Sequence, residues 1–177
     1  MIINFVGAPC SGKSTLACNL FTELKKRHLN TEYLHEYVKT LIWENNIDDI
    51  NNQYVVAKKQ YTMLKNVNAS TDYTVTDSPL ILGLLYNEYN KYNVSDITKT
   101  REFILGHLRE FASESLYIFV KRNRNFAYKT QGRIHSEAES DYIESLLEIM
   151  LKNLGINYLE VNPDDPIENI LEFVQLI

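Results

Sequence analysis

The residues with the clearest chemistry lie near the N-terminus, where the chain reads GAPCSGKST from Gly7 to Thr15. They fit the pattern G-x-x-x-x-G-K-[ST], in which glycines let the backbone fold around a phosphate with its N–H groups pointing inward. In such a loop Lys13 brings a positive charge to the β- and γ-phosphates, and the Ser14 hydroxyl is a ligand for Mg²⁺. We therefore expect a phosphate-binding loop (P-loop) holding a nucleoside triphosphate, formed by Gly7, Ala8, Pro9, Cys10, Ser11, Gly12, Lys13, Ser14 and Thr15.

Two acidic residues follow short apolar runs and are the next candidates for chemistry. Glu36 follows Glu32–His35, and Asp77 follows Tyr73–Thr76. A carboxylate at Glu36 could accept the proton of an attacking hydroxyl, or it could simply start a helix, where the macrodipole favours an acid. Asp77 stands where P-loop proteins place a ligand of Mg²⁺-bound water or a substrate contact. We therefore expect catalytic roles for Lys13, Glu36 and Asp77. We expect Ser14 and Asp77 to bind the metal.

The residues after Asp77 predict the start of a helix. Ser78 is expected to cap this helix and Pro79 to occupy its first turn, before the apolar stretch that begins at Leu80. Such capping is compatible with a metal-facing Asp77, because capping uses the Ser78 hydroxyl and metal binding uses the Asp77 carboxylate.

A basic segment, VKRNRNFAYKTQGRIHS, follows the fourth apolar run in a chain that is otherwise acidic. Such a flap could close over a triphosphate, exclude water and neutralise the transferring phosphoryl group, or it could be a solvated loop. We assign nucleotide contacts to Arg122 and Arg124 and a catalytic contact to Arg133. On the acceptor side, Gln60 lies in an expected helix, Tyr54–Val67, where its amide could read a nucleobase or a nicotinamide group. The alternative for Gln60 is an exposed polar position.

The elements that must position these residues alternate along the chain. Apolar, β-prone runs occur at Ile2–Val6, Glu32–His35, Tyr73–Thr76, Leu116–Val120 and Ile156–Val161, with helical spacing between them. This alternation predicts an α/β fold with a parallel sheet that is buried on both faces by right-handed crossovers. Ligands of such sheets bind at the carboxyl ends of the strands, which is where the candidate residues stand.

Length and composition limit the remaining possibilities. A chain of 177 residues predicts one domain, residues 1–177, with a substantial core. Its net charge of −5 disfavours nucleic acid and anionic membranes as partners. Two cysteines without metal-site spacing predict reduced thiols, and neither a membrane-length apolar run nor a secretion signal is recognisable, so we expect a cytoplasmic protein. A homodimer is compatible with these properties.

Four stretches, GAPCSGKSTLACNLFTELKK, LHEYVKTLIWE, TVTDSPLILGLLY and KTQGRI, resemble the small P-loop nucleoside and nucleotide kinases. They are most similar to the NadR-type nicotinamide riboside kinase domains and related phage-encoded proteins, and the similarity extends in collinear order over nearly the whole chain. The resemblance implies a three-layer P-loop NTPase fold with a five-stranded parallel sheet in the order 2-3-1-4-5. It also implies ATP–Mg²⁺ as donor and a short lid, at about residues 121–136.

The same resemblance assigns residues and shows two departures. Lys13 and Ser14 match the phosphate and Mg²⁺ residues, Glu36 and Asp77 match acidic acceptor-side and metal-side positions, and Arg133 matches a lid arginine. Many relatives place an arginine directly after the Asp77 position to grip phosphate, where this chain has Ser78-Pro79. Lys39 stands where relatives often have arginine. Both departures weaken the case for a monophosphate acceptor.

We therefore expect ATP-dependent phosphoryl transfer to the hydroxyl of a nucleoside-like small molecule. One alternative is a nucleoside monophosphate kinase, in which Lys39 and the lid arginines would bind the acceptor phosphate. Another is an ATP-binding assembly or regulatory factor with weak ATPase activity. A GTP switch is disfavoured, because VKRNRN stands where a guanine-reading N-K-x-D element would follow the fourth strand.

Overall fold

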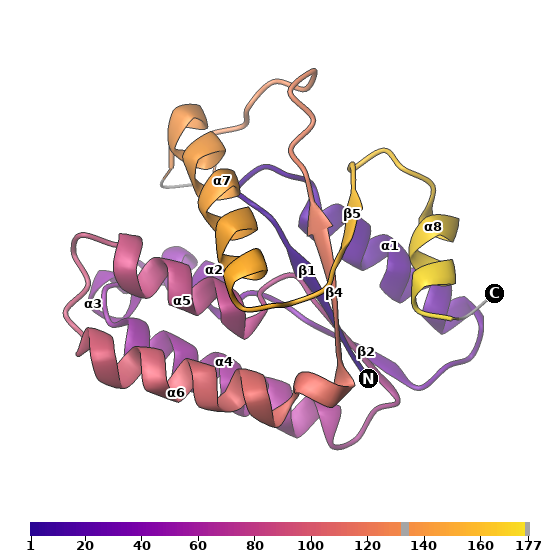
Figure 1. The fold of residues 1–177 in the computed structure, drawn as a ribbon, viewed down its shortest axis with the longest axis horizontal. Helices are drawn as coiled ribbons and strands as arrows, with labels where there is room; N and C mark the ends of the chain where they lie inside the picture. The colour runs from indigo at the N-terminus through magenta and orange to yellow at the C-terminus, as the bar shows by residue number, and fades with distance from the viewer. Residues whose placement is uncertain (132–134, 176–177) are drawn as a thin grey trace.

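The computed structural model describes residues 1–131 and 135–175, and a parallel sheet lies at its centre. Its five strands stand in the order β2-β3-β1-β4-β5, which confirms the expected topology (Figure 1). Each neighbouring pair is parallel, and the strands are β1 (Ile2–Val6), β2 (Thr31–Leu34), β3 (Tyr73–Thr76), β4 (Ser115–Val120) and β5 (Leu159–Val161).

The last strand is shorter than the sequence predicts. The β4–β5 ladder begins with the pair Ile118–Leu159, so Ile156 precedes the first residue with a strand partner. Ile156 instead packs against the helices on one face of the sheet. Its apolar character therefore serves helix packing, which a β-prone run cannot reveal.

Helices cover both faces of the sheet, giving three layers (Figure 1). One face carries α1 (Lys13–Lys26) and α8 (Ile167–Phe173). The other carries α4 (Gln53–Asn68), α5 (Leu80–Tyr89) and α7 (Glu137–Asn153), with α6 (Ile97–Glu110) packed on α4 and α5. Two short helices, α2 (Tyr37–Trp43) and α3 (Ile47–Ile50), lead from β2 to α4, and a single 3₁₀ turn (Ala112–Glu114) precedes β4.

The central strand shows why the sheet needs helices on both faces. In β1, Ile2 and Val6 point into the core beneath α4, α5 and α7, whereas Ile3 and Phe5 point into the core beneath α1 and α8. All four side chains are fully buried. Alternation with a period of two thus distributes one apolar run between two cores, which is the expected pattern of a central parallel strand.

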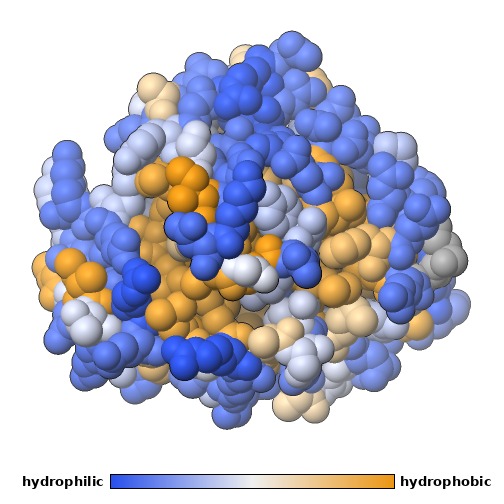
Figure 2. All heavy atoms as spheres, viewed as in Figure 1, coloured by the Kyte–Doolittle hydropathy of each residue, from blue (hydrophilic) through white to orange (hydrophobic). Residues whose placement is uncertain are grey.

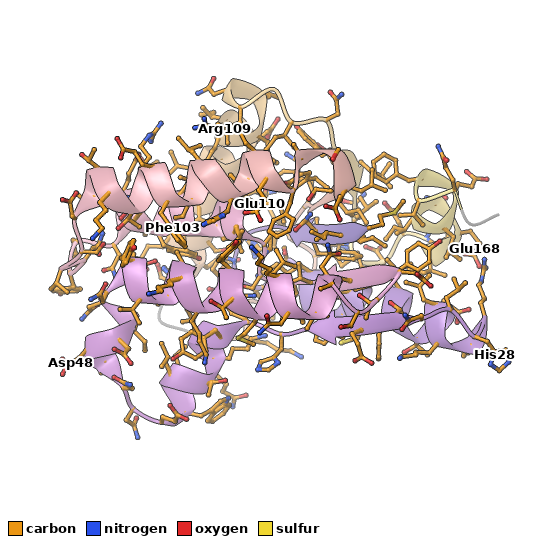
Figure 3. The ribbon with its side chains drawn as sticks, turned by 90° about the horizontal axis from the view of Figure 1, so that it is seen from below. His28, Asp48, Phe103, Arg109, Glu110 and Glu168 are labelled. Atoms are coloured by element: carbon orange, nitrogen blue, oxygen red, sulfur yellow. The ribbon has the colours of Figure 1, made fainter. Side chains whose placement is uncertain are left out.

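An aromatic and charged cluster fastens α6 to α4. The Tyr61 ring stacks on His107 with 3.6 Å between ring centroids and meets Phe103 at 5.8 Å. The Tyr61 hydroxyl donates to the Glu110 carboxylate at 3.2 Å, and Figure 3 shows Phe103 and Glu110 between the two helices. A hydrogen bond with His107 lowers the pKa of Glu110. These contacts hold α4, which carries Gln60, against the outer helix.

The surface of the helical layer carries an apolar groove. Figure 2 shows hydrophobic side chains gathered between α7 and the α5–α6 pair, where Leu84, Leu146 and Ile149 line a hollow. Within the described part of the chain, no helix combines the length and apolar character needed to span a bilayer.

Candidate active site

The P-loop joins β1 to α1 through a backbone with two left-handed residues. Cys10 has a φ of 66° and Gly12 a φ of 90°, and Gly12 is the N-cap of α1. A Cβ on Gly12 would lie 2.6 Å from the Cβ of Pro163, so a larger residue would be both strained and crowded there. The backbone N–H of Ser11 donates to the Ala8 carbonyl at 3.2 Å, which tightens the turn. The loop therefore opens onto the N-terminus of a helix, where anions bind favourably.

A compact polar corner forms where the P-loop meets the end of β3. The Ser14 hydroxyl donates to Oδ2 of Asp77, a residue that is fully buried. Lys39 Nζ lies 3.4 Å from Ser14 Oγ, 3.6 Å from Asp77 Oδ2 and 3.9 Å from Glu36 Oε2. Three candidate residues that are far apart in the sequence, Ser14, Glu36 and Asp77, thus meet around one lysine.

The corner has the donor set of a magnesium site. Ser14 and Asp77 offer oxygen ligands, and the buried Oδ1 of Asp77 has no hydrogen-bond partner among the described residues. No group of three or more His, Cys, Asp or Glu side chains suited to a metal occurs in the described ranges. A sparse protein contribution of this kind suits Mg²⁺, which keeps several waters and binds through substrate phosphates. Ser14 and Asp77 therefore fit the metal that the sequence predicts.

Glu36 stands at the N-cap position of α2 but makes no capping hydrogen bond with its side chain. The carboxylate instead faces Lys39 and lines a pocket beside the P-loop. A purely helix-starting role does not account for this orientation. Glu36 is therefore free to serve a ligand in the pocket.

A deep pocket extends from the P-loop between α2, α3, α4 and α5. Pro9, Lys13 and Glu36 line the end nearest the P-loop, and apolar side chains that include Ile42 and Leu82 line its walls. Its volume, counted with the open mouth, is about 990 Å³. That space includes open solvent at the mouth. A cleft with mostly apolar walls and a few polar groups at one end is the usual form of a small-molecule site.

Gln60 is buried in the wall of this pocket, so the interpretation as an exposed polar position is wrong. Its side chain accepts a hydrogen bond from the Tyr37 backbone N–H at 3.2 Å, while Nε2 is buried without a described partner. The signal was present in the sequence, because Gln60 shares the spacing of the buried residues Gln53, Ala57 and Leu64 on α4. An amide donor is thus available to a ligand.

Two further residues line the pocket that the sequence did not assign to it. Tyr86 projects from α5, and burial together with the charge of Glu36 raises the pKa of its hydroxyl. His135 lies at the pocket beside Tyr86, with ring centroids 5.7 Å apart. Burial lowers the pKa of His135, and the charge of Lys13 acts in the same direction. Tyr86 is one of three tyrosines at positions 86, 89 and 92 in the sequence, and only the fold shows that it lines the pocket.

Comparison with known proteins identifies the family of the chain. A model of the protein family described as an AAA domain (AAA_28) matches residues 2–168. The chain belongs to this family. No curated protein sequence matches the chain.

Two solved structures share the fold of this AAA-domain chain. The YorR protein from Bacillus subtilis, solved in complex with phosphorylated GDP, is 15% identical with a TM-score of 0.63, covering 99% of this chain and 96% of YorR. A deoxyadenosine kinase from M. mycoides, solved with the products dCMP and a flexible dCDP, is 17% identical with a TM-score of 0.65, covering 99% and 97%. At this identity the likeness establishes the fold alone, and the resemblance to NadR-type kinase domains stays a prediction.

The helix after β3 begins one residue later than a serine cap would require. Pro79, in an extended conformation, is the N-cap of α5, and the helix begins at Leu80. No side-chain cap bond forms, so the expected capping by Ser78 is wrong. The Ser78 backbone N–H instead donates to Thr76 Oγ1 at 3.1 Å, which stabilises the turn that presents Asp77.

The arginines that follow β4 are paired with acidic residues of α7. The Arg122 side chain is 3% exposed and binds Glu137 at 2.9 Å and Asp141 at 2.8 Å. Arg124 binds Asp141 at 3.3 Å and Glu144 at 3.2 Å. Arg122 uses all three guanidinium nitrogens in these contacts, so binding a triphosphate would require some of them to break. Arg124 is 58% exposed and uses one nitrogen. The nucleotide-binding role of both arginines stays a prediction. Arg133 lies outside the described residues.

Helix α7 also contacts the P-loop directly. The fully buried Ser140 hydroxyl donates to the Pro9 carbonyl at 2.5 Å. Because Asp141 and Glu144 of the same helix hold Arg122 and its backbone N–H, one helix connects the P-loop to the end of β4. Ser140 thereby positions the P-loop backbone.

Replacing Ser140 with alanine is expected to lower the free energy of unfolding by about 1 kcal/mol, because the buried Pro9 carbonyl loses its donor. Affinity for a nucleoside triphosphate should fall about fivefold for the same reason, since a less constrained loop must be ordered on binding. Urea unfolding and calorimetric titration with a non-hydrolysable triphosphate measure the two effects. Ser145→Ala on the same helix is the matched control, because the Ser145 hydroxyl is exposed. Equal behaviour of the two variants would contradict this role of Ser140.

Proposed function

We propose that the chain transfers the γ-phosphoryl group of ATP to a hydroxyl of a nucleoside-like small molecule. The observation that carries this proposal is the shared pocket, in which Pro9 and Lys13 of the P-loop stand beside Glu36, with Gln60 and Tyr86 further along its walls. A hydrolase or a switch has no need of a second, largely apolar cavity against its phosphate loop. A transferase needs one, because it must hold the acceptor in line with the phosphate.

The donor side consists of the P-loop and the Ser14–Asp77 corner. The loop amides and Lys13 would bind the β- and γ-phosphates at the N-terminus of α1. Mg²⁺ held at Ser14 and Asp77 would neutralise charge on the phosphates. Lys13 also lines the acceptor pocket, so its charge lies between the two substrates.

The transfer step uses the carboxylate at the junction. Glu36 would accept the proton of the acceptor hydroxyl while the hydroxyl oxygen bonds to the γ-phosphorus. The bond from that phosphorus to the bridging oxygen of ATP breaks, and ADP leaves with the electron pair. Preorganised positive charge from Lys13 and the loop dipoles would stabilise the transferring group.

The acceptor pocket favours an uncharged nucleoside over its monophosphate. Lys13 and Lys39 line it, and no arginine occurs among its described lining residues. Its walls offer aliphatic side chains and the Tyr86 ring against which a base could pack, and Gln60 offers a buried amide donor. Both similar structures bind molecules of the nucleotide class, phosphorylated GDP in YorR and the products dCMP and dCDP in the deoxyadenosine kinase.

Transfer from radiolabelled ATP to a panel of nucleosides, nicotinamide riboside and the matching 5′-monophosphates tests the proposal. We expect at least one nucleoside to be phosphorylated faster than its monophosphate. Preference for a monophosphate would favour the nucleotide kinase, and would assign Lys39 to the acceptor phosphate. ATP turnover that responds to no acceptor would contradict transfer and favour an ATP-binding regulatory factor.

A further inference from the structure

The position of Lys39 suggests a second role beyond acceptor binding. Its ammonium group lies within 3.9 Å of oxygens from Ser14, Asp77 and Glu36, and donates a hydrogen bond to the first at 3.4 Å. The Asp77 side chain is buried, whereas that of Lys39 is 47% exposed. The lysine therefore reaches inward from solvent and places its charge on a buried carboxylate.

The same oxygens are the ones that suit Mg²⁺. A magnesium ion bound directly to Ser14 Oγ would lie about 2.1 Å from that atom. Since the ammonium lies 3.4 Å from the same oxygen, the two cations would be no more than about 5.5 Å apart. At this separation in a partly buried site they repel each other strongly, and each would compensate the charge of Asp77.

The affinity of this corner for Mg²⁺ therefore depends on where the Lys39 ammonium lies. Asp77 already has a counter-charge in Lys39, so a free divalent ion gains little by binding to the corner. A triphosphate brings additional negative charge to the same place. Lys39 has a flexible four-carbon stem and an exposed position, so its ammonium can turn from Asp77 toward a phosphate without disturbing α2.

We propose that Lys39 is a resident counter-cation that keeps free divalent metal out of the Ser14–Asp77 corner and yields it to metal that arrives with the triphosphate. This rests on the proposed function for the identity of the triphosphate, but it concerns the metal alone. The consequence is that metal and nucleotide bind with positive coupling, and that Lys39 is the source of much of that coupling.

Binding of Mn²⁺ to the nucleotide-free protein, followed by electron paramagnetic resonance, tests this directly. Lys39→Met should bind Mn²⁺ about tenfold or more tightly than wild type, because the competing charge is gone. Lys39→Arg keeps the charge and should bind as weakly as wild type. Adding Asp77→Asn to Lys39→Met should abolish the gain, which locates the ion at this corner.

The matched control is Lys59→Met on α4, whose ammonium lies over the Tyr37 ring and not on a carboxylate. It should leave Mn²⁺ affinity unchanged, and near-ultraviolet circular dichroism verifies that each variant is folded. A second readout is the factor by which a non-hydrolysable ATP analogue tightens Mn²⁺ binding, which should be smaller in Lys39→Met than in wild type.

Equal Mn²⁺ affinity of wild type and Lys39→Met, including no binding by either, would overturn the proposal. So would a gain in Lys39→Arg equal to that in Lys39→Met, because charge would not then be the cause. Neither result depends on phosphoryl transfer. A chain that shows the metal competition but phosphorylates no acceptor would refute the proposed function and leave this inference standing.

Discussion

Replacing Lys13 with alanine is expected to lower phosphoryl transfer on the order of 10³-fold while the protein remains folded. Lys13 is the first residue of α1 and faces the pocket shared by the two substrates. Its ammonium also donates to the Ala8 carbonyl at 3.4 Å, so it is held against the loop. The loop amides can still bind the phosphates without Lys13, but they carry no net charge to neutralise the transferring group.

Steady-state transfer with the best acceptor of the panel measures this loss. The matched control is Lys26→Ala at the far end of the same helix, where the exposed side chain pairs only with Glu23 among the contacts that the structure gives. It should leave the rate unchanged. Retention of transfer to within about tenfold in Lys13→Ala would remove Lys13 from the proposed mechanism.

The sheet and the phosphate loop were predictable because their signals are local. A β-prone run followed by GAPCSGKST contains both the strand and the turn chemistry, and the structure places β1 over the predicted residues, Ile2–Val6. Topology alone predicts that Glu36 and Asp77 lie at the same edge of the sheet, because parallel strands end on the same side. In the structure both carboxylates approach the Lys39 ammonium, Glu36 at 3.9 Å and Asp77 at 3.6 Å.

The partners of the long basic side chains could not be predicted in this way. Arg122 and Arg124 read as a phosphate-binding flap, because the sequence does not show which charge faces them. The structure supplies Glu137, Asp141 and Glu144, which stand one turn apart on α7 and therefore on one face. A long flexible side chain takes the nearest carboxylate in three dimensions, and the choice depends on how a helix is rotated against the sheet.

The burial of Gln60 illustrates a different difficulty. A glutamine is usually exposed, so its residue type kept an exposed position open as the alternative for Gln60. Its spacing with Ala57 and Leu64 placed it on the buried face of α4 all the same. Where residue type and helical position disagree, a functional site is a frequent reason, because buried polar groups without a partner are costly unless a ligand satisfies them.

Replacing Glu36 with glutamine is expected to lower the turnover number between about 10²- and 10⁴-fold, with little change in the Michaelis constant for ATP. Glutamine keeps the shape of the side chain but cannot accept the hydroxyl proton. The donor site depends on the P-loop, Ser14 and Asp77, and Glu36 is linked to it through Lys39, which keeps its contacts with Ser14 and Asp77 after the substitution. A loss confined to turnover is therefore the result that a general base predicts and that a packing or helix-starting role does not.

The matched control for Glu36→Gln is Glu32→Gln on β2, where the exposed carboxylate pairs with Lys25 at 3.2 Å. It should leave both kinetic constants unchanged. Glu36→Asp provides a second comparison, because it keeps the carboxylate but withdraws it by one methylene, and it should retain more activity than glutamine. If Glu36→Gln and Glu36→Asp lose activity equally, geometry rather than basicity is what Glu36 supplies. If neither loses activity, proton transfer needs another acceptor, and the acceptor hydroxyl would then have to give its proton to solvent or to the phosphate.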